Sequence, residues 1–587
     1  MKADTLTIKK VFVNDTMLEI PFYQRHYVWD EEKHQNWSRF AEEMENTMNT
    51  NQTTFFGSLI LKKVEKTDTD RANGVSTHYI VVDGQQRMTT ICIYMKLLHM
   101  MTDRMEEFNS HYMLDPGAAV SILRHNCEDK ADFDAIMSLD TPKDLSARAL
   151  SNIINAYEYF RIRFLSLSSN GINLNDLRNS IYSNVQFVAI ELNTDDNEQK
   201  IFDTINSLGV DLTTDELLKN YLYGINDKYK YESTWKRTFD SRQAQEFWGT
   251  DAAATRQKKG DRTIDRFLHA FVRVKMWDFK DQLTPVQKKE FVKKENVYTT
   301  CQAFVKDFGM SRLALADEII SYAELYKKYL DPDILNHRVP NYAGIERVSC
   351  IINALQLHVI TPYVLYILKN VNTQSERNKI FSHLETYLIR RILAHTNDNS
   401  YSDLFSENLI GQKVASYDGF VEYISNRDGN LAMPSDNELS RNLLLYSIDE
   451  VHAQLVWYLF ETKLTPASDP TFQCSFSSVE VEQLMPSPNS YNASTWIPLS
   501  DPDEELDRKT MAKTLGNWFL LAEPDTRMLN KVKNAPLAKK LTTYRQWDNS
   551  VRSSHAKLAG LTSWTVDDIR LRNIDYATSL AQNVWRV

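Results

Sequence analysis

The chain has 587 residues, of which 42% are hydrophobic and 25% are charged, and its formal net charge is −10. This is the balance of an ordinary soluble protein that can bury a large core, and the length favours about three domains. Sixteen Gly and 16 Pro are few for this length, which argues against turn-rich barrels, propellers and repeats and favours a high helix content.

The first segment, residues 1–230, is predicted to combine strands with helices. Strands are expected at Leu18–Phe22, Phe55–Leu61, Tyr79–Val82 and Gln186–Leu192, and helices at Trp37–Met48 and Asn197–Ser207. The polar stretch 66–76 is predicted to be the loop of a hairpin between the second and third strands.

The second segment, residues 231–461, is predicted to be helical. Apolar residues recur every three or four positions in Val348–Leu368 and in Arg377–Ala394. The first of these runs includes polar residues and a proline, so it is better explained as a core helix than as a membrane span. The pair Arg390-Arg391 is expected to lie on a solvated or salt-bridged helix edge.

The third segment, residues 462–587, is predicted to hold a strand at Phe476–Glu482 and a turn leading into a strand at Leu515–Leu521, followed by helices. From Arg527 to Val587 there are eleven Lys or Arg and four Asp or Glu, a net of +7, which leaves −17 on the rest. A basic end on an acidic body suggests a phosphate-binding face, although a solvated helical face explains it equally well.

The five Cys residues include no Cys-x-x-Cys pair, and the first residues lack an apolar signal segment. These features give neither a zinc-ribbon pattern nor a disulfide framework, and they fit a reducing compartment. We therefore expect a cytoplasmic protein without a membrane anchor.

The most informative motif is Asp83-Gly84-Gln85-Gln86-Arg87, which directly follows a predicted buried strand and precedes a predicted helix. Backbone donors and a helix N-terminus converge at such a corner, and arginine adds donors suited to phosphate or carboxylate. A solvated structural corner is the alternative explanation.

Two more polar clusters lie in the same segment. The stretch 20–29 places Gln24-Arg25 among aromatic residues, which suits stacking on a base and holding a phosphate, or else a buried aromatic corner. The stretch 202–213 contains Asn206, although helix capping explains much of this stretch. The chain has no Walker P-loop, so any nucleotide would be bound without one.

Taken together, PFYQRHYVW, FFGSLIL, IVVDGQQRMTT and FDTINSLGVDLTTDELLKNYL resemble, in this order and spacing, the N-terminal domain of GmrSD-type restriction proteins. The resemblance covers about 200 residues and implies a ParB/sulfiredoxin-like domain that binds and hydrolyses nucleoside triphosphates (GTP or ATP). It also implies that this activity controls attack on modified phage DNA. The implied hydrolytic residues are Asp83, Gln86 and Arg87, and the implied nucleotide-binding residues are Gln24, Arg25, Gly84, Gln85 and Asn206.

The third segment resembles the C-terminal half of the same family, a His-Asn-His-like nuclease of the ββα-metal type. The family pattern Glu-His-Ile-x-Pro, then Leu-Gly-Asn, then an Asn-rich stretch appears here as Glu482-Gln483-Leu484-Met485-Pro486, Leu515-Gly516-Asn517, and Asn530 with Asn534. The implied fold class is α+β and predominantly helical, with a helical region between the two domains.

The replacement of the family's histidine by Gln483 alters the expected chemistry. In such nucleases the histidine is the general base, and a neutral amide cannot accept a proton near neutral pH. The degenerate site would keep Gln483, Asn517 and Asn530, while Glu480 and Glu482 are candidate ligands for Mg²⁺.

Three functional hypotheses follow. In the first, the chain is a component of a type IV restriction system that handles nucleotide, and a second family subunit with an intact nuclease motif cuts the DNA; pairing of identical chains is also possible. In the second, the chain is a self-sufficient, metal-dependent endonuclease. In the third, it is a non-enzymatic DNA-binding scaffold of a defence system.

Overall fold

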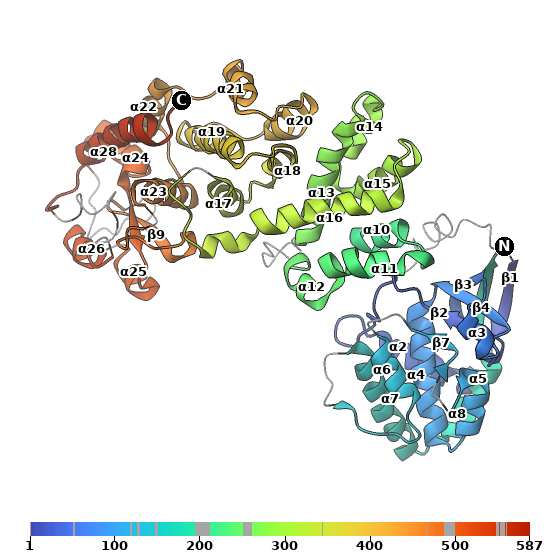
Figure 1. Cartoon of the computed structure of the whole chain (residues 1–587). Helices are drawn as coiled ribbons and strands as arrows, with labels where there is room; N and C mark the ends of the chain where they lie inside the picture. Colours follow the sequence, from blue (N-terminus) through green and yellow to red (C-terminus); the bar gives the residue numbers. More distant parts are fainter. Residues whose placement is uncertain are drawn as a thin grey trace. The chain divides into compact units, whose positions relative to one another are not determined.

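The computed structural model describes the whole chain except residues 1, 51–52, 118–119, 126–128, 147–150, 194–211, 251–260, 343, 467, 487–498, 534, 548–550, 552–557 and 559. The described part is α+β and predominantly helical, as predicted. It divides into two compact units, residues 1–237 and 238–587 (Figure 1). The predicted division into domains 1–230, 231–461 and 462–587 stays a prediction. Within the described ranges, no helix combines the length and apolar character needed to cross a bilayer.

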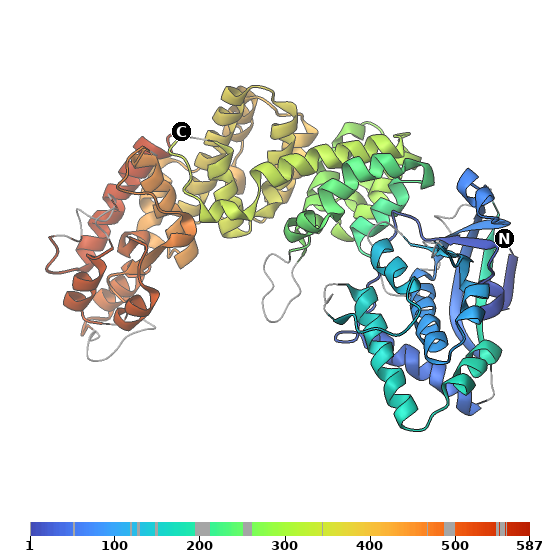
Figure 2. The same ribbon diagram turned by 60° about the horizontal axis from the view of Figure 1, so that its bottom comes forward.

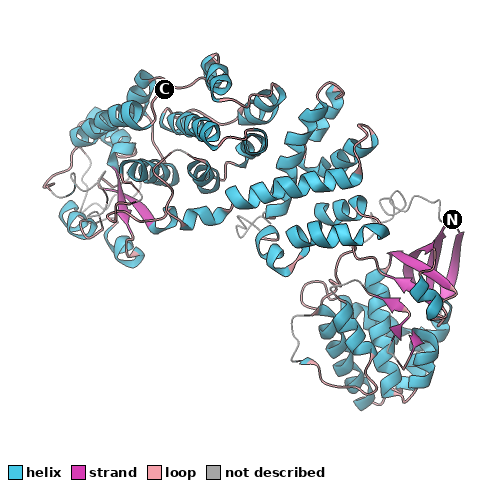
Figure 3. Ribbon diagram, viewed as in Figure 1, coloured by secondary structure: helices cyan, strands magenta, loops and turns pink. Residues whose placement is uncertain are grey.

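The first unit is built on a six-stranded mixed sheet, drawn in magenta in Figure 3. Strand β3 pairs antiparallel with β4 and parallel with β8, whereas β2 runs parallel to both of its neighbours. A separate small sheet joins β5 (Met113–Asp115) to β6 (Val120–Ser121). In spatial order the six strands are β1 (Lys2–Thr7), β8 (Val185–Leu192), β3 (Thr54–Val64), β4 (Thr77–Asp83), β2 (Thr16–Glu19) and β7 (Leu123–Arg124).

Most helices of the first unit gather beside one face of this sheet, and the main hydrophobic core lies between the two layers (Figures 1 and 2). The helices of the unit are α1 (Ile8–Val11), α2 (Asn36–Thr50), α3 (Asp68–Ala72), α4 (Gln85–Met101), α5 (Met105–Tyr112), α6 (Lys130–Met137), α7 (Asn152–Ser169), α8 (Leu174–Asn184), α10 (Thr214–Leu222) and α11 (Lys228–Tyr231).

Helix α4 is the central helix of this unit. All of its residues except Gln85, Arg87 and Met101 are buried, which explains why its sequence shows no amphipathic stripe. It begins at Gly84, whose φ of +100° suits glycine, and a Cβ there would lie 2.4 Å from the Leu59 side chain. Because Gly84 directly follows β4, the predicted strand–turn–helix corner is confirmed.

The described residues of the second unit are helical apart from one pair of strands. Its helices are α12 (Arg242–Trp248), α13 (Thr263–Lys275), α14 (Pro285–Phe291), α15 (Val297–Lys306), α16 (Arg312–Tyr329), α17 (Ile345–Leu355), α18 (Thr361–Asn370), α19 (Gln374–Leu393), α20 (Leu409–Gly411), α21 (Tyr417–Ser425), α22 (Asp436–Leu445), α23 (Glu450–Leu464), α24 (Pro502–Met511), α25 (Thr526–Val532), α26 (Leu537–Tyr544) and α28 (Val566–Ser579). The strands β9 (Val479–Gln483) and β10 (Trp518–Ala522) pair antiparallel.

Most predicted elements lie close to observed ones, with three differences. The 66–76 loop contains helix α3, which a capping box between Thr67 and Asp70 stabilises. The predicted helix 348–368 is two helices, α17 and α18, separated by a turn at residues 356–360. The predicted helix 197–207 lies outside the described residues.

A solvated edge at Arg390-Arg391 is wrong, because both side chains are buried, whereas the salt-bridged alternative holds for Arg390. Arg390 pairs with Asp436 and donates to the main-chain oxygens of Pro434 and Trp585. Arg391 donates to the Tyr401 hydroxyl and lies over its ring. Long-range partners therefore satisfy charges that a helical pattern alone assigns to solvent.

Candidate functional site

Glutamine side chains hold the main chain of residues 21–29, here called the strap, over the carboxyl end of β4. Gln24 Nε2 donates to the main-chain oxygens of Val81, at 2.7 Å, and Val82, at 3.1 Å. Gln85 Nε2 donates to the Arg25 oxygen at 3.0 Å. The polar clusters around residues 24 and 85, which lie far apart in the sequence, thus form one corner.

Gln86 holds the strap through both the nitrogen and the oxygen of its side-chain amide. Its Nε2 donates to the His26 oxygen at 3.0 Å, and its Oε1 accepts from Val28 N at 2.9 Å and from Trp29 N at 3.4 Å. In contrast, Gln85 Oε1 is buried and has no hydrogen-bond partner among the described residues. The described bonds of Gln24 and Gln86 therefore hold the main chain, whereas Gln85 holds it through Nε2 alone.

Arg87 lies at the first turn of α4 and is held in a fixed direction. Its Nη2 donates to the Ser58 oxygen at 2.7 Å and to Asp83 Oδ2 at 3.1 Å, and both charged side chains are about 25% exposed. The close approach depends on Gly57, where φ is +85° and a Cβ would lie 2.3 Å from Arg87 Nη1. A shift of register in β3 between Phe55 and Ser58 accompanies this glycine.

The wall behind the corner combines buried neutral side chains with one carboxylate, because Asp129 Oδ2 accepts from Tyr27 N at 2.7 Å. The Tyr27 hydroxyl lies 2.6 Å from Thr90 Oγ1 and accepts from Trp37 Nε1, and burial raises the pKa of Tyr27 well above its usual range. His125 Nε2 lies 2.8 Å from Thr89 Oγ1, and burial lowers the pKa of His125 to about 3. Positive charge at the corner comes from Arg87 and from the first-turn N–H groups of α4, and the main chain of half-buried Arg25 lies beside them.

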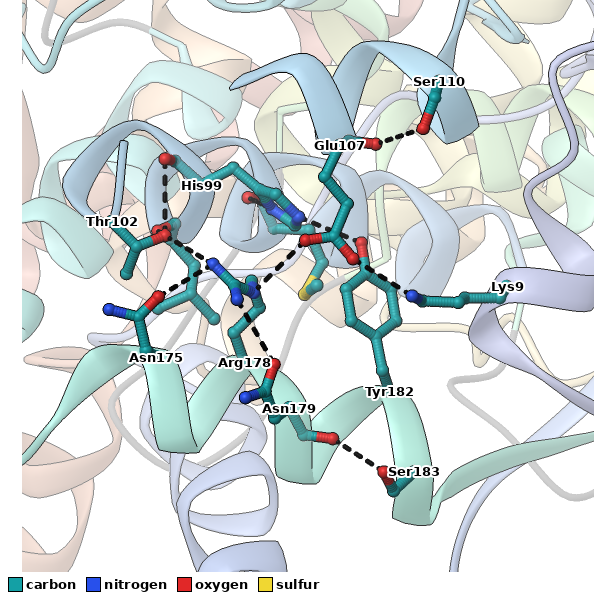
Figure 4. Close-up of polar contacts among 12 residues, drawn as sticks. Lys9, His99, Thr102, Glu107, Ser110, Asn175, Arg178, Asn179, Tyr182 and Ser183 are labelled. Atoms are coloured by element: carbon teal, nitrogen blue, oxygen red, sulfur yellow. Dashed lines mark hydrogen bonds and ion pairs between the residues drawn. The ribbon is translucent and has the colours of Figure 1, made fainter. Parts of the chain in front are cut away.

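The opposite end of α4 is anchored by a polar network (Figure 4). Glu107 Oε1 accepts from Lys9 Nζ at 3.0 Å, and Glu107 Oε2 lies 3.6 Å from Arg178 Nε. Arg178 Nη1 donates to Thr102 Oγ1 at 3.1 Å, just past the end of α4. Buried His99 lies beside this network, and burial lowers the pKa of His99 to about 4. With both ends of α4 tied down, its N-terminus is held in place at the corner.

The sequence analysis missed a buried ionic cluster on the sheet of the first unit. His78 Nδ1 lies 2.8 Å from Asp70 Oδ2, and His78 Nε2 lies 3.0 Å from Glu19 Oε2. Arg124 reaches both carboxylates at 3.2 Å. These four residues come from separate segments, so no local spacing marks them.

In the second unit, Glu480 and Glu482 alternate with buried valines along β9. Glu482 is 5% exposed and faces the helices α25 and α26, whereas Glu480 is half-buried. Lys533 Nζ lies 3.6 Å from Glu482 Oε1. Burial raises the pKa of Glu482, although the charges of Lys533 and Lys540 oppose this shift.

Asn517 braces the chain after β9. Its Oδ1 accepts from Met485 N at 2.9 Å and from Trp564 Nε1 at 3.0 Å. Its Nδ2 donates to the oxygens of Met485 and Ala512, both at 2.7 Å. Every hydrogen-bonding position of this fully buried amide is used, so Asn517 acts on the fold.

The other predicted nuclease residues differ in how far they are exposed. Gln483 is half-buried, and its main-chain oxygen accepts from Lys540 Nζ at 2.8 Å. Asn530 is exposed on α25. Asn206 and Asn534 lie outside the described residues. Burial lowers the pKa of Lys540 to about 8, while Glu482 opposes that shift.

The residues around Glu482 fit a divalent metal ion poorly. Mg²⁺ prefers carboxylate oxygens together with water, in octahedral geometry. Glu482 is instead buried beside two ammonium groups, and no group of three or more His, Cys, Asp and Glu side chains within the described ranges could hold a metal. The metal-binding role of Glu480 and Glu482 stays a prediction that this geometry argues against.

A mixed sheet with a polar strand–helix corner defines the first unit as an α+β domain with a candidate anion site. Residues 8–223 match the family model described as the GmrSD restriction endonuclease, N-terminal domain. No curated protein matched the chain. The match includes the whole corner from Gln24 to Arg87 and assigns this unit to the GmrSD-type restriction family. The match indicates a restriction-system role for this unit.

Proposed function

We propose that the first unit binds and hydrolyses a nucleoside triphosphate, GTP or ATP, at the corner formed by residues 21–29 and 83–87. The observation that carries this proposal is the placement of Arg87. Its guanidinium is partly exposed at the N-terminus of α4 and is held by Asp83 and Ser58. A planar guanidinium in a fixed direction suits phosphate oxygens, because little side-chain entropy is lost on binding.

The rest of the corner supports the same ligand. Arg25 adds a second cation, and the N–H groups of Gln85, Gln86 and Arg87 add the partial positive charge of a helix N-terminus. Hydrogen bonds from Gln24, Gln85 and Gln86 fix the strap, which carries Arg25. In this proposal Asp83 sets the direction of Arg87, and Asn206 remains a further candidate contact.

At the level of the whole chain, nucleotide turnover would control attack on modified phage DNA in the cytoplasm. The DNA would be cut by a second family subunit with an intact nuclease motif, because Gln483 cannot serve as a general base. Pairing of identical chains is compatible with this arrangement.

A specific observation also favours contact of this chain with DNA. Residues 526–547 carry six Lys or Arg and no Asp or Glu. Among these cations, Arg527, Lys531, Lys533 and Lys539 are exposed on α25, α26 and the turn between them. Such a group of cations suits the phosphate backbone irrespective of sequence. DNA binding without nucleotide turnover is therefore the second candidate function.

The test is phosphate release from ATP and GTP, with Mg²⁺, by the purified full chain. Arg87→Ala is expected to lower the rate by about 10²–10³-fold, the usual cost of losing one transition-state donor. Arg71→Ala is the matched control, because Arg71 forms an exposed pair with Asp68 in the same unit. The wild-type chain is expected to leave supercoiled plasmid intact.

Three outcomes would change the conclusion. Equal rates for Arg87→Ala and the wild type would remove the corner from the mechanism. Nucleotide binding without phosphate release would favour the DNA-binding scaffold. Plasmid cleavage that Glu482→Ala abolishes would instead favour a self-sufficient nuclease.

A further inference from the structure

An ammonium group is built into the end of β9 in the second unit. Lys540, on α26, is 1% exposed, and its Nζ donates to the Gln483 oxygen at 2.8 Å and lies 3.3 Å from the Leu484 oxygen. Glu482 lies on the same side of the strand and is 5% exposed, with Lys533 Nζ 3.6 Å from its carboxylate. Three consecutive residues thus offer oxygens to two lysines.

The two carbonyl oxygens that contact Lys540, and the Glu482 carboxylate that pairs with Lys533, are of the kind that a hard divalent cation uses. Two main-chain carbonyls and a carboxylate are typical ligands of such ions. An ammonium group has three donors, and here it has a short bond to one of these carbonyls. A divalent ion at this position would lie within a few ångströms of two ammonium charges, inside a poorly solvated region where repulsion is weakly screened.

We propose that the Lys540 ammonium stands in for a divalent metal ion at the end of β9, so that this site takes up no Mg²⁺. The lysine keeps the Gln483–Leu484 segment in place, and Asn517 holds the next residue, Met485, from the other side. The region is therefore a nuclease-like scaffold stabilised by an internal cation.

This inference deepens one part of the proposed function, namely that the chain does not cut DNA alone. It does not depend on nucleotide hydrolysis at Arg87, which lies in the other unit. A failure of the nucleotide proposal would therefore leave it untouched. The wild-type chain could cut plasmid although it binds no metal ion through Glu482. That result would overturn the proposal that a partner subunit cuts the DNA, and it would leave the inference about Lys540 standing.

The first test measures Mn²⁺ binding, by electron paramagnetic resonance, to the full chain without nucleotide. The wild type and Glu482→Gln are compared, because Gln keeps the shape of the side chain and removes its charge. The expected result is the same number of bound ions for both proteins. One additional ion on the wild type, absent from Glu482→Gln, would overturn the proposal.

The second test compares the melting temperatures of Lys540→Met and Lys539→Met, a neighbouring exposed lysine on the same helix. Lys540→Met is expected to lower Tm by roughly 5–10 °C, because it leaves a buried carboxylate with less compensation. Lys539→Met should leave Tm nearly unchanged. Adding Glu482→Gln to Lys540→Met should restore part of the loss, since the unpaired charge is then absent. Equal Tm values for the two single variants would contradict a role for Lys540 as the internal cation.

Discussion

The corner after β4 in the first unit and the corner after β9 in the second begin with similar sequences but differ in what they leave accessible. Each places an acidic residue and glutamine close to the end of a strand, as Asp83 to Gln86 and as Glu482-Gln483. At the first corner, neutral amides bind the main chain and Arg87 stays partly exposed. At the second, a lysine from another helix binds the main chain and is buried.

This difference indicates what makes a polar motif either a ligand-binding site or a structural support of the fold. A side chain whose donors and acceptors are all used by main-chain groups cannot also bind a ligand, because buried polar groups must stay paired. Asn517 uses all four of its positions, three of them on main-chain groups and one on Trp564 Nε1, and Gln86 binds three main-chain groups. The guanidinium of Arg87, in contrast, keeps a solvent-facing side. The first corner is therefore the better candidate for chemistry, and the second is better suited to stability.

The largest effect on stability is expected at the second corner, from Asn517→Ala. The change removes four hydrogen bonds from a fully buried amide and leaves buried partners unpaired, which should cost about 3–5 kcal/mol. Urea unfolding of the full chain measures this loss. Asn530→Ala, at an exposed position on α25, should change stability by less than about 0.5 kcal/mol. Similar values for both variants would remove the distinction between brace and surface.

At the first corner, Gln86→Leu should cost less, about 2–3 kcal/mol. It keeps most of the side-chain volume but leaves the His26 oxygen and the Val28 N–H without their partner. Because the strap carries Arg25, we also expect phosphate release to fall. Gln85→Leu removes one bond from the same strap and serves as the milder variant. Equal stability of the two variants would mean that the second contact of Gln86 is unimportant.

Gly57→Ala tests the space beside Arg87. The new Cβ would lie 2.3 Å from Arg87 Nη1, so the guanidinium must move, and we expect phosphate release to fall about tenfold with a stability loss of about 1–2 kcal/mol. Gly74→Ala is the matched control, because Gly74 also has a positive φ, of +71°, and open space around its Cβ. Gly74→Ala should lower stability through backbone strain and should leave the rate of phosphate release unchanged. Equal rates for the two variants would show that the position of Arg87 is not decisive.

The smallest expected effect of a single substitution concerns how the stability of the first unit depends on pH. Burial lowers the pKa of His99 to about 4 and of His125 to about 3 in the folded chain. Unfolding returns each to about 6.5, so the unfolded chain takes up protons that the folded chain does not. Stability should therefore fall as the pH drops below 6.5, by about 1 kcal/mol per histidine for each pH unit down to about 4.

Urea unfolding at pH 6.5 and 5.5 checks this dependence. His99→Gln should show a smaller loss between the two pH values than the wild type. His34→Gln, at an exposed histidine, should keep the wild-type loss. Identical losses for wild type and His99→Gln would indicate that His99 is not held neutral by the fold.

Much of the local structure could be predicted from the sequence because local rules govern it. Strands β3, β4 and β8 follow apolar runs, and the corner at Gly84 follows from a glycine placed between a strand and a helix. The split between α17 and α18 was missed, since the apolar run continues through it while the chain turns at Gln356, whose φ is +53°. Apolar periodicity reports burial, and it does not report where a helix ends.

The sequence by itself determined that Gln24-Arg25 and Asp83 to Arg87 are polar clusters near the ends of strands. It also determined that position 483 holds a glutamine, which cannot act as a general base. Only the tertiary structure decided that Gln24, Gln85 and Gln86 bind the main chain of distant segments, and that Lys540 lies buried beside Glu482. The physical reason is that partners far apart in the chain decide whether a polar group is exposed or consumed. The type of a residue fixes what it can bond, and packing fixes which of those bonds remain for a ligand.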